Sequence, residues 1–478
     1  MDDLLRDAAE RAIRYRREVG NRPVWPRAAA VEALERLDEA LPAIRQDDAA
    51  VLALLDEIAS PATVATSGGR FFGFVIGSSL PATLAANLLA GAWDQNAGGV
   101  IQSPAAARLE EVATEWLLDV LGLPDGCGAG FVTCATMANV SGLAAARHAL
   151  FARKGWDVDS HGLFGAPPIT VVVGEEAHVS VLKALGLLGL GRDRVVRVPV
   201  DDQGRMRADG LPPLDDHTIV CIQAGNVNTG AFDPADTIVP QAQRAGAWVH
   251  VDGAFGLWAA ATPARAHLLA GYADADSWAT DAHKWLNVPY DSGIVFVREG
   301  QHLRGAMTTS AAYLVRGERR DPYDSTPELS RRARGVEVWA ALRSLGREGL
   351  ADLVERSCRH ASRFAGGLRG AGWTILNDVV INQVLVSFGD PEMTRQVIAA
   401  VQADGTCWVG GTEWQGHTAM RISVSSWATT DDDVEQSLAA IVRVAEEVRR
   451  LEPVSTPRRR TLTGIGREGE STDTRPHS

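Results

Sequence analysis

Apolar residues recur at two different spacings along the chain, and the spacings divide it into regions. Near the N-terminus they fall three and four residues apart, for example at Leu4, Leu5, Ala8 and Ala12. This pattern predicts amphipathic helices over about the first 60 residues. A further amphipathic helix is expected over residues 107–121.

From residue 125 to residue 300 the pattern changes to short apolar runs separated by helical stretches. Strands that are buried on both faces have such runs, so the alternation predicts a largely parallel sheet covered by helices on both sides. The expected strands are 169–173, 195–200, 218–223, 247–251, 277–280 and 293–297. In such sheets, ligands bind just beyond the carboxyl ends of the strands, and site residues are expected there.

Beyond residue 330 the pattern predicts a smaller α+β domain. Its expected elements are helices over 336–345 and 350–368, strands over 373–376, 381–388 and 420–424, and a final helix from 431 to about 450. The polar residues after 452 have little apolar surface to bury, which indicates a disordered tail. We therefore expect an N-terminal helical segment (1–75), a large domain (76–328), a small domain (329–452) and a tail (453–478).

Charge and cysteine content exclude several classes of protein. The chain has 60 acidic and 47 basic residues, a net charge of −13, whereas binding to nucleic acid requires a basic surface. The five cysteines are widely spaced and form no CxxC motif, which is typical of a reduced, cytoplasmic chain without a disulfide framework or a metal site. Residues 1–10 carry no apolar signal core, and no uninterrupted apolar run approaches about 18 residues, so we expect neither a secretory signal nor a membrane span.

Two residues at strand ends are candidates for carbonyl chemistry. Lys284 follows the expected strand 277–280 and lies between His283 and Trp285. A lysine in a partly desolvated cleft can attack an aldehyde, although most lysines simply lie on the surface. Asp252 ends the strand 247–251, where its carboxylate can pair with a pyridinium nitrogen or cap a turn.

Two further segments add a ring contact and a phosphate site. His178 follows strand 169–173 and opens a helix, where an imidazole can stack on a ring or fill a purely structural role. The segment 131–139 follows a run of glycines and is a small, hydroxyl-bearing turn that leads into a helix. Such a turn can bind a phosphate, but an ordinary capped helix has the same pattern. The order of the four segments is more specific than any one of them.

In this order the segments resemble the group II pyridoxal-phosphate decarboxylases, which include the aromatic-amino-acid, glutamate, tyrosine and cysteine-sulfinate decarboxylases. The resemblance runs from about Arg70 to about Ala445. The matching motifs are His250-Val251-Asp252-Gly253-Ala254, His283-Lys284-Trp285, Ser103-Pro104-Ala105 with Leu109-Glu110, Ala224-Gly225-Asn226 through Phe232-Asp233, and Ser78-Ser79-Leu80-Pro81.

The resemblance implies an α/β fold of pyridoxal-enzyme type I, similar to aspartate aminotransferase. A mainly parallel seven-stranded sheet would form the large domain, beside a small α+β domain. The resemblance also implies bound pyridoxal 5'-phosphate, an amino acid as the small-molecule substrate, and a homodimer with shared active sites. In such dimers the N-terminal helices clasp the neighbouring subunit.

The resemblance also implies roles for individual residues. Lys284 would hold the cofactor as a Schiff base, Asp252 would bond its pyridine nitrogen, and His178 would stack on its ring. Tyr323 lies in the charged segment 315–327, which we interpret as a mobile surface loop, and would deliver a proton to the substrate Cα. The other implied cofactor contacts are Ala135, Thr136, Asn226, Ala254, Thr280 and His283, and the implied substrate pocket residues are Ile76, Asn96 and Gly98.

The chain departs from the animal aromatic-amino-acid enzymes in two respects, at Asp281 and in the wall of the substrate pocket. Asp281 stands where those enzymes have Asn, and a carboxylate beside a phosphate is repulsive. The segment 94–99 replaces bulkier residues, and Ile76 replaces a hydroxyl residue. The sequence therefore does not identify the side chain of the substrate.

The leading hypothesis is a decarboxylase that converts an L-amino acid to its amine and carbon dioxide. An aminotransferase or a carbon–carbon lyase is the first alternative, because a fold does not determine a reaction. Arg421 fits either a carboxylate-binding role or a structural one. A catalytically inactive relative that acts as a scaffold is the second alternative.

Overall fold

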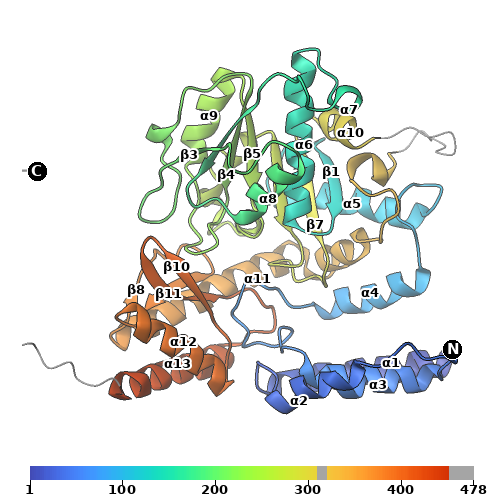
Figure 1. The fold of residues 1–478 in the computed structure, drawn as a ribbon, viewed down its shortest axis with the longest axis vertical. Helices are drawn as coiled ribbons and strands as arrows, with labels where there is room; N and C mark the ends of the chain where they lie inside the picture. The colour runs from blue at the N-terminus through green and yellow to red at the C-terminus, as the bar shows by residue number, and fades with distance from the viewer. Residues whose placement is uncertain (309–319, 452–478) are drawn as a thin grey trace, which may run out of the picture.

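The computed structural model describes residues 1–308 and 320–451 (Figure 1). The tail expected over 453–478 lies outside the described residues, as does the part of segment 315–327 that precedes residue 320. Within the two described ranges, every helix is too short or too polar to cross a lipid bilayer.

A seven-stranded sheet forms the centre of the large domain, with the strand order β1-β7-β6-β5-β4-β2-β3. Strands β2 to β6 run parallel, whereas β7 is antiparallel to both β6 and β1. The expectation of a mainly parallel sheet is therefore confirmed. The strands are β1 (Gly128–Val132), β2 (Thr170–Gly174), β3 (Val196–Val198), β4 (Thr218–Gln223), β5 (Trp248–Asp252), β6 (Ser277–Asp281) and β7 (Gly293–Val297).

Burial on both faces explains why these strands could be predicted. Every residue of β4, β5, β6 and β7 is buried, because helices cover both sides of the sheet (Figure 1). The expected strand over 195–200 is shorter than predicted, since only Val196–Val198 pairs with β2. Strand β1 was not predicted, because its sequence, Gly-Ala-Gly-Phe-Val, begins in a glycine-rich stretch that is typical of a loop.

Besides seven short 3-10 helices, thirteen α-helices lie within the described residues. They are α1 (Asp2–Glu18), α2 (Ala28–Glu32), α3 (Asp48–Ala62), α4 (Pro81–Trp93), α5 (Pro104–Val120), α6 (Ala135–Arg153), α7 (Val158–His161), α8 (Val179–Leu187), α9 (Ala235–Ala245), α10 (Gly300–Met307), α11 (Gly335–Gly370), α12 (Pro391–Asp404) and α13 (Asp431–Leu451). Helices α1 and α3 lie side by side, away from the large sheet, and α4 runs between them and that sheet (Figure 1).

A second, antiparallel sheet forms the small domain, with the strand order β10-β11-β9-β8. Its strands are β8 (Thr374–Ile375), β9 (Gln383–Ser387), β10 (Gly410–Trp414) and β11 (His417–Ser423). Helix α11 adopts non-helical backbone angles at Gly346 (φ 59°, ψ −173°), close to the gap between the two helices that the sequence predicts. Its residues up to Cys358 join the core of the large domain, and those from Ala361 join the core of the small domain.

Candidate active site

Lys284 lies in a short turn beyond β6, and a carboxylate ties this turn to the start of α6. Its Nζ atom is 3.2 Å from Asp281 Oδ2, and its side chain is 19% exposed. The other carboxylate oxygen of Asp281 accepts a 2.6 Å hydrogen bond from the backbone N–H of Ala135, the first residue of α6. Asp281 therefore faces both the lysine and the N-terminus of the helix, where the partial positive charge of the helix stabilises an anion.

His283 closes the same group from the other side. Its Nδ1 atom accepts a hydrogen bond from the Ser292 N–H, and its Nε2 atom lies 3.5 Å from Asp281 Oδ1. Burial lowers the pKa of His283, and its ring packs against the Tyr290 ring at a tilt of 30°, with 4.3 Å between the ring centroids. Thr280 is fully buried, and its hydroxyl has no hydrogen-bond partner among the described residues.

Asp252 ends β5 in a second polar group, and its side chain is almost fully buried. Its Oδ2 atom accepts hydrogen bonds from Asn139 Nδ2 and Ser180 Oγ, and its Oδ1 atom accepts one from the Ala254 N–H, each at 3.3 Å. An ionised carboxylate can accept about four hydrogen bonds. Within the described residues, one acceptor position on Oδ1 is therefore open for a further donor.

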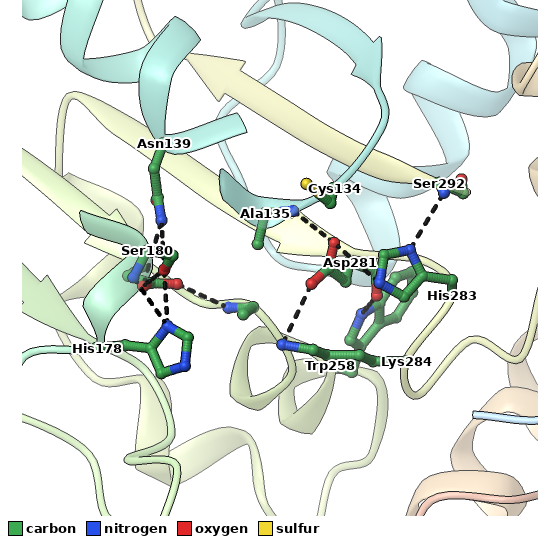
Figure 2. Close-up of polar contacts among 12 residues, drawn as sticks. Cys134, Ala135, Asn139, His178, Ser180, Trp258, Asp281, His283, Lys284 and Ser292 are labelled. Atoms are coloured by element: carbon green, nitrogen blue, oxygen red, sulfur yellow. Dashed lines mark hydrogen bonds and ion pairs between the residues drawn. The ribbon is translucent and has the colours of Figure 1, made fainter. Parts of the chain in front are cut away.

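His178 caps the N-terminus of α8. Its Nδ1 atom accepts a hydrogen bond from the Ser180 N–H at 3.2 Å and lies 2.8 Å from Ser180 Oγ. Burial lowers the pKa of His178, and the positive charges of Lys284 and Arg421 lower it further, against the opposing effect of Asp252. The imidazole is therefore neutral at neutral pH. Figure 2 shows the two groups side by side, with the Lys284 amine on the edge of its group that faces His178.

These residues fit pyridoxal 5'-phosphate, the cofactor that the sequence resemblance implies. Lys284 offers an accessible amine, and Asp252 offers the open acceptor position for a protonated ring nitrogen. The backbone N–H groups of Thr136 and Met137, in the first turn of α6, have no acceptor within the helix and can bind a phosphate. Thr280 alternates with Asp281 along β6, so its side chain lies on the sheet face opposite Asp281 and the start of α6.

Other residues that the sequence singles out lie at the edges of this site. The Asn226 Oδ1 atom accepts hydrogen bonds from the N–H groups of Asn228 and Thr229, so Asn226 shapes its own turn. Arg421 donates one hydrogen bond to Val227 O, whereas its buried Nε has no partner among the described residues. Ile76 packs in a cluster with Val19 and neighbouring apolar residues.

Tyr323, Asn96 and Gly98 belong to a third group, in which the loop 96–100 meets residues 320–327. The Tyr323 N–H donates to Gly98 O at 2.8 Å, and the Tyr323 hydroxyl donates to Asp321 Oδ2 at 3.2 Å. Asn96 Oδ1 accepts from the N–H groups of Gly98 and Arg331.

The interpretation of segment 315–327 as a surface loop is wrong for its described part. Pro322, Tyr323 and Ser325 are buried in a short 3-10 helix, 322–325. The charged groups of this segment form hydrogen bonds within the protein. The Asp321 carboxylate accepts a hydrogen bond from the Val100 N–H, and the Arg320 guanidinium donates one to Ala129 O. Composition alone could not reveal these contacts.

Three side chains of the site were not among the expected residues, namely Asn139, Ser180 and His250. Two of them have local signals in the sequence. Ser180 stands two residues after His178 at the start of a helix, and His250 stands two residues before Asp252, on the same face of β5. Asn139 lies one helical turn beyond Ala135 on α6.

Comparison with known proteins gives consistent matches over most of the chain. A family model described as "Pyridoxal-dependent decarboxylase conserved domain" matches residues 32–388. Tryptophan decarboxylase 1 of Oryza sativa subsp. japonica is 28% identical over 79% of this chain and 80% of its own. The 4-hydroxyphenylacetaldehyde synthase of Rhodiola rosea is 24% identical over 91% of this chain and 92% of its own.

The fold also matches solved structures. The crystal structure of Oryza sativa TDC with PLP and tryptamine superposes with a TM-score of 0.86 at 24% sequence identity, covering 93% of this chain and 97% of that chain. The expected fold, a mainly parallel seven-stranded sheet beside a small α+β domain, is confirmed by this match.

Proposed function

Because the chain belongs to the pyridoxal-dependent decarboxylase family, we propose that it converts an L-amino acid to the corresponding amine and carbon dioxide. The observation that carries this proposal is the convergence of Lys284, Asp252 and His178 at the carboxyl ends of β6, β5 and β2 in one sheet. The cofactor of the family is pyridoxal 5'-phosphate. When it is bound, it supplies an aldehyde that reacts with the lysine amine and a ring that withdraws electrons from the substrate.

The residues of this chain would bind and orient the reactants around that ring. Asp252 would accept a hydrogen bond from the ring nitrogen, and the start of α6 would hold the phosphate. Arg421 would receive the substrate carboxylate, since its guanidinium has a buried N–H group without a partner among the described residues and planar guanidinium groups bind carboxylates well. The neutral His178 imidazole would cover the ring.

The decisive experiment is a product screen. Purified protein with added pyridoxal 5'-phosphate is incubated with each common L-amino acid, and the carbon dioxide and amine that form are measured. We expect the two products in equal amounts. The keto acid expected from an aminotransferase is measured in the same samples. Keto acid without carbon dioxide, or no product from any amino acid, would contradict the proposal.

An aldehyde-forming reaction is the second candidate, because the Rhodiola rosea relative carries the name of an aldehyde synthase. Such a reaction consumes one oxygen and one water molecule for each amino acid and gives aldehyde, carbon dioxide, ammonia and hydrogen peroxide. Oxygen uptake and peroxide, measured in the same screen, distinguish the two outcomes.

We further propose that the active form is a homodimer. Large apolar side chains are exposed on helices α1, α3 and α4, at Leu5, Ile13, Val51, Leu54, Leu55, Leu88, Leu89 and Trp93. Apolar groups that gather on one part of a surface mark an interaction site. The loop 96–100, whose Gly98 carbonyl accepts the Tyr323 N–H, comes soon after α4, and Ile101, the next residue, is 77% exposed.

The dimer leads to a prediction about α4. Leu88→Glu combined with Leu89→Glu should convert a stable dimer into a monomer and abolish activity, because obligate interfaces bury more than about 2,000 Å² and tolerate charge at their centre poorly. Mass photometry at nanomolar concentration measures the mass. Phe164→Glu is the matched control, since Phe164 is 99% exposed but lies outside these helices. A monomeric wild-type protein with full activity would refute the dimer.

Tyr323 gives a second prediction. We propose that the Tyr323 phenol delivers the proton to the substrate Cα. The loop 96–100, whose Gly98 carbonyl accepts the Tyr323 N–H, would hold this phenol at the site. Tyr323→Phe should slow amine formation roughly 100-fold, since a positioned acid contributes about 10²–10⁴-fold, and should raise the share of aldehyde and peroxide among the products. Steady-state rates of amine, aldehyde and peroxide formation test this.

Tyr272→Phe controls for the loss of a buried phenol. Its hydroxyl donates to Gln223 O and lies 2.9 Å from Asp233 O, away from the lysine turn. This variant should lose stability while keeping the product ratio of the wild type. If Tyr323→Phe forms amine at the normal rate, another group delivers the proton.

A further inference from the structure

A continuous line of buried side chains lies behind Asp252. It runs from Trp248 through Ser277, His250 and Asn139 to the Asp252 carboxylate, and we refer to these five residues as the Asp252 relay. Successive hydrogen bonds measure 2.9 Å (Trp248 Nε1 to Ser277 Oγ), 2.8 Å (Ser277 Oγ to His250 Nδ1), 2.9 Å (His250 Nε2 to Asn139 Oδ1) and 3.3 Å (Asn139 Nδ2 to Asp252 Oδ2). None of the five side chains is more than 5% exposed.

The end nearest Asp252 determines the direction of these bonds. An ionised carboxylate only accepts hydrogen bonds, so Asn139 must turn its NH₂ group toward Asp252 and its oxygen toward His250. The Asn139 oxygen also only accepts, and His250 must therefore carry its proton on Nε2. Burial lowers the pKa of His250 to about 4, so the ring carries a single proton, on Nε2. The unprotonated Nδ1 atom accepts a hydrogen bond from the Ser277 hydroxyl.

The far end requires the same direction. The indole N–H of Trp248 can only donate, which makes Ser277 Oγ its acceptor and leaves the single Ser277 proton for His250. Both ends therefore agree, and each donor in the line faces an acceptor. A mutually consistent buried network of this kind holds its members in one orientation.

Helix α6 is shaped to accommodate the imidazole. A Cβ atom at Gly142 would lie 2.7 Å from His250 Cε1 and 2.9 Å from His250 Nδ1. Glycine in a helix interior costs up to about 1 kcal/mol relative to alanine, and the close approach of His250 explains its presence there. Asn139 lies one turn closer to the start of this helix.

We propose that His250 and Asn139 are positioning residues that hold Asp252 ready to accept a hydrogen bond from the cofactor's ring nitrogen. Neither residue needs to touch the cofactor. Asn139 and Ser180 each donate a hydrogen bond to Asp252 Oδ2. These two bonds fix the orientation of the carboxylate, so that the open acceptor position is on Oδ1. This inference rests on the proposed function only in assigning pyridoxal 5'-phosphate to the site.

The experiment compares two ligands that differ at one atom. Full-length protein stripped of cofactor is titrated with pyridoxal 5'-phosphate, and separately with an analogue that has a C–H group in place of the ring nitrogen. The intrinsic fluorescence of the 13 tryptophans reports binding. His250→Leu should weaken pyridoxal 5'-phosphate about tenfold, the size of one hydrogen bond to a charged group, and should leave the analogue unchanged within about twofold.

Conservative variants separate positioning from packing. His250→Gln retains one donor and one acceptor and should bind pyridoxal 5'-phosphate nearly as well as the wild type. Ser277→Ala removes little volume and should show a smaller selective loss, which keeps the test available if His250→Leu does not fold. Ser141→Ala is the control, because Ser141 is a buried serine of α6 whose hydroxyl, in the part of the chain that the structure describes, bonds only to Met137 O.

The outcomes decide between two explanations. A selective loss for pyridoxal 5'-phosphate supports the relay, whereas equal losses for both ligands, or no loss for either, would overturn it. The same selective loss in Ser141→Ala would also overturn it. These titrations involve no amino acid, so a protein that fails to release carbon dioxide would refute the proposed decarboxylation without affecting this result.

Discussion

Lys284→Ala should abolish carbon dioxide release while leaving the protein folded. The lysine supplies the amine that attaches to the cofactor aldehyde, and no other lysine can take its place. The chain has three lysines, Lys154, Lys183 and Lys284, and Lys154 is occupied by an ion pair with Asp216. We expect a loss of roughly a thousandfold or more, within the range that removal of a positioned acid–base and nucleophilic group produces.

The small number of lysines makes the chemical test unambiguous. Borohydride reduction of the protein with bound cofactor, followed by peptide mass mapping, should place the added mass on Lys284. Lys154→Ala and Lys183→Ala serve as controls and should keep wild-type activity. An adduct on either of those lysines, or none at all, would show that Lys284 does not hold the cofactor.

Several strands of the large sheet were predictable because a strand covered on both faces must be apolar almost throughout. β4 and β7 satisfy this rule and were expected with their observed bounds. β1 and β10 break it, since each contains two glycines and β10 is partly exposed at most of its positions. In both cases pairing with a neighbouring strand overrides a weak local preference.

Contacts between distant segments of the site could not be predicted from local sequence. Asn139 contacts Asp252 across 113 residues, and which helix covers which end of a sheet is decided by the packing of the whole domain. The same limit applies to Asp321 and Arg320. Their charges suggested a surface loop, but their partners are backbone groups of loop 96–100 and β1.

Asp252→Asn should leave the protein folded and still able to bind cofactor, but should reduce turnover about 10²–10³-fold, the loss typical of removing one preorganised electrostatic group. The carboxylate carries the negative charge that stabilises a protonated ring nitrogen in a site of low dielectric constant. A neutral amide removes this charge. It also places its NH₂ group against one of three donors, namely the Asn139 amide, the Ser180 hydroxyl or the Ala254 N–H, which should weaken cofactor binding modestly.

Asp233→Asn provides a matched control for this loss. Asp233 is about as buried as Asp252, accepts hydrogen bonds from the N–H groups of Met206 and Gln223, and has its pKa raised by burial to about 6. Its replacement should lower the melting temperature without changing kcat, because its partners are structural. If Asp252→Asn instead turns over substrate at a near-normal rate, the ring nitrogen does not depend on Asp252. If both variants lose kcat equally, the loss reflects damage to the fold rather than the missing charge at Asp252.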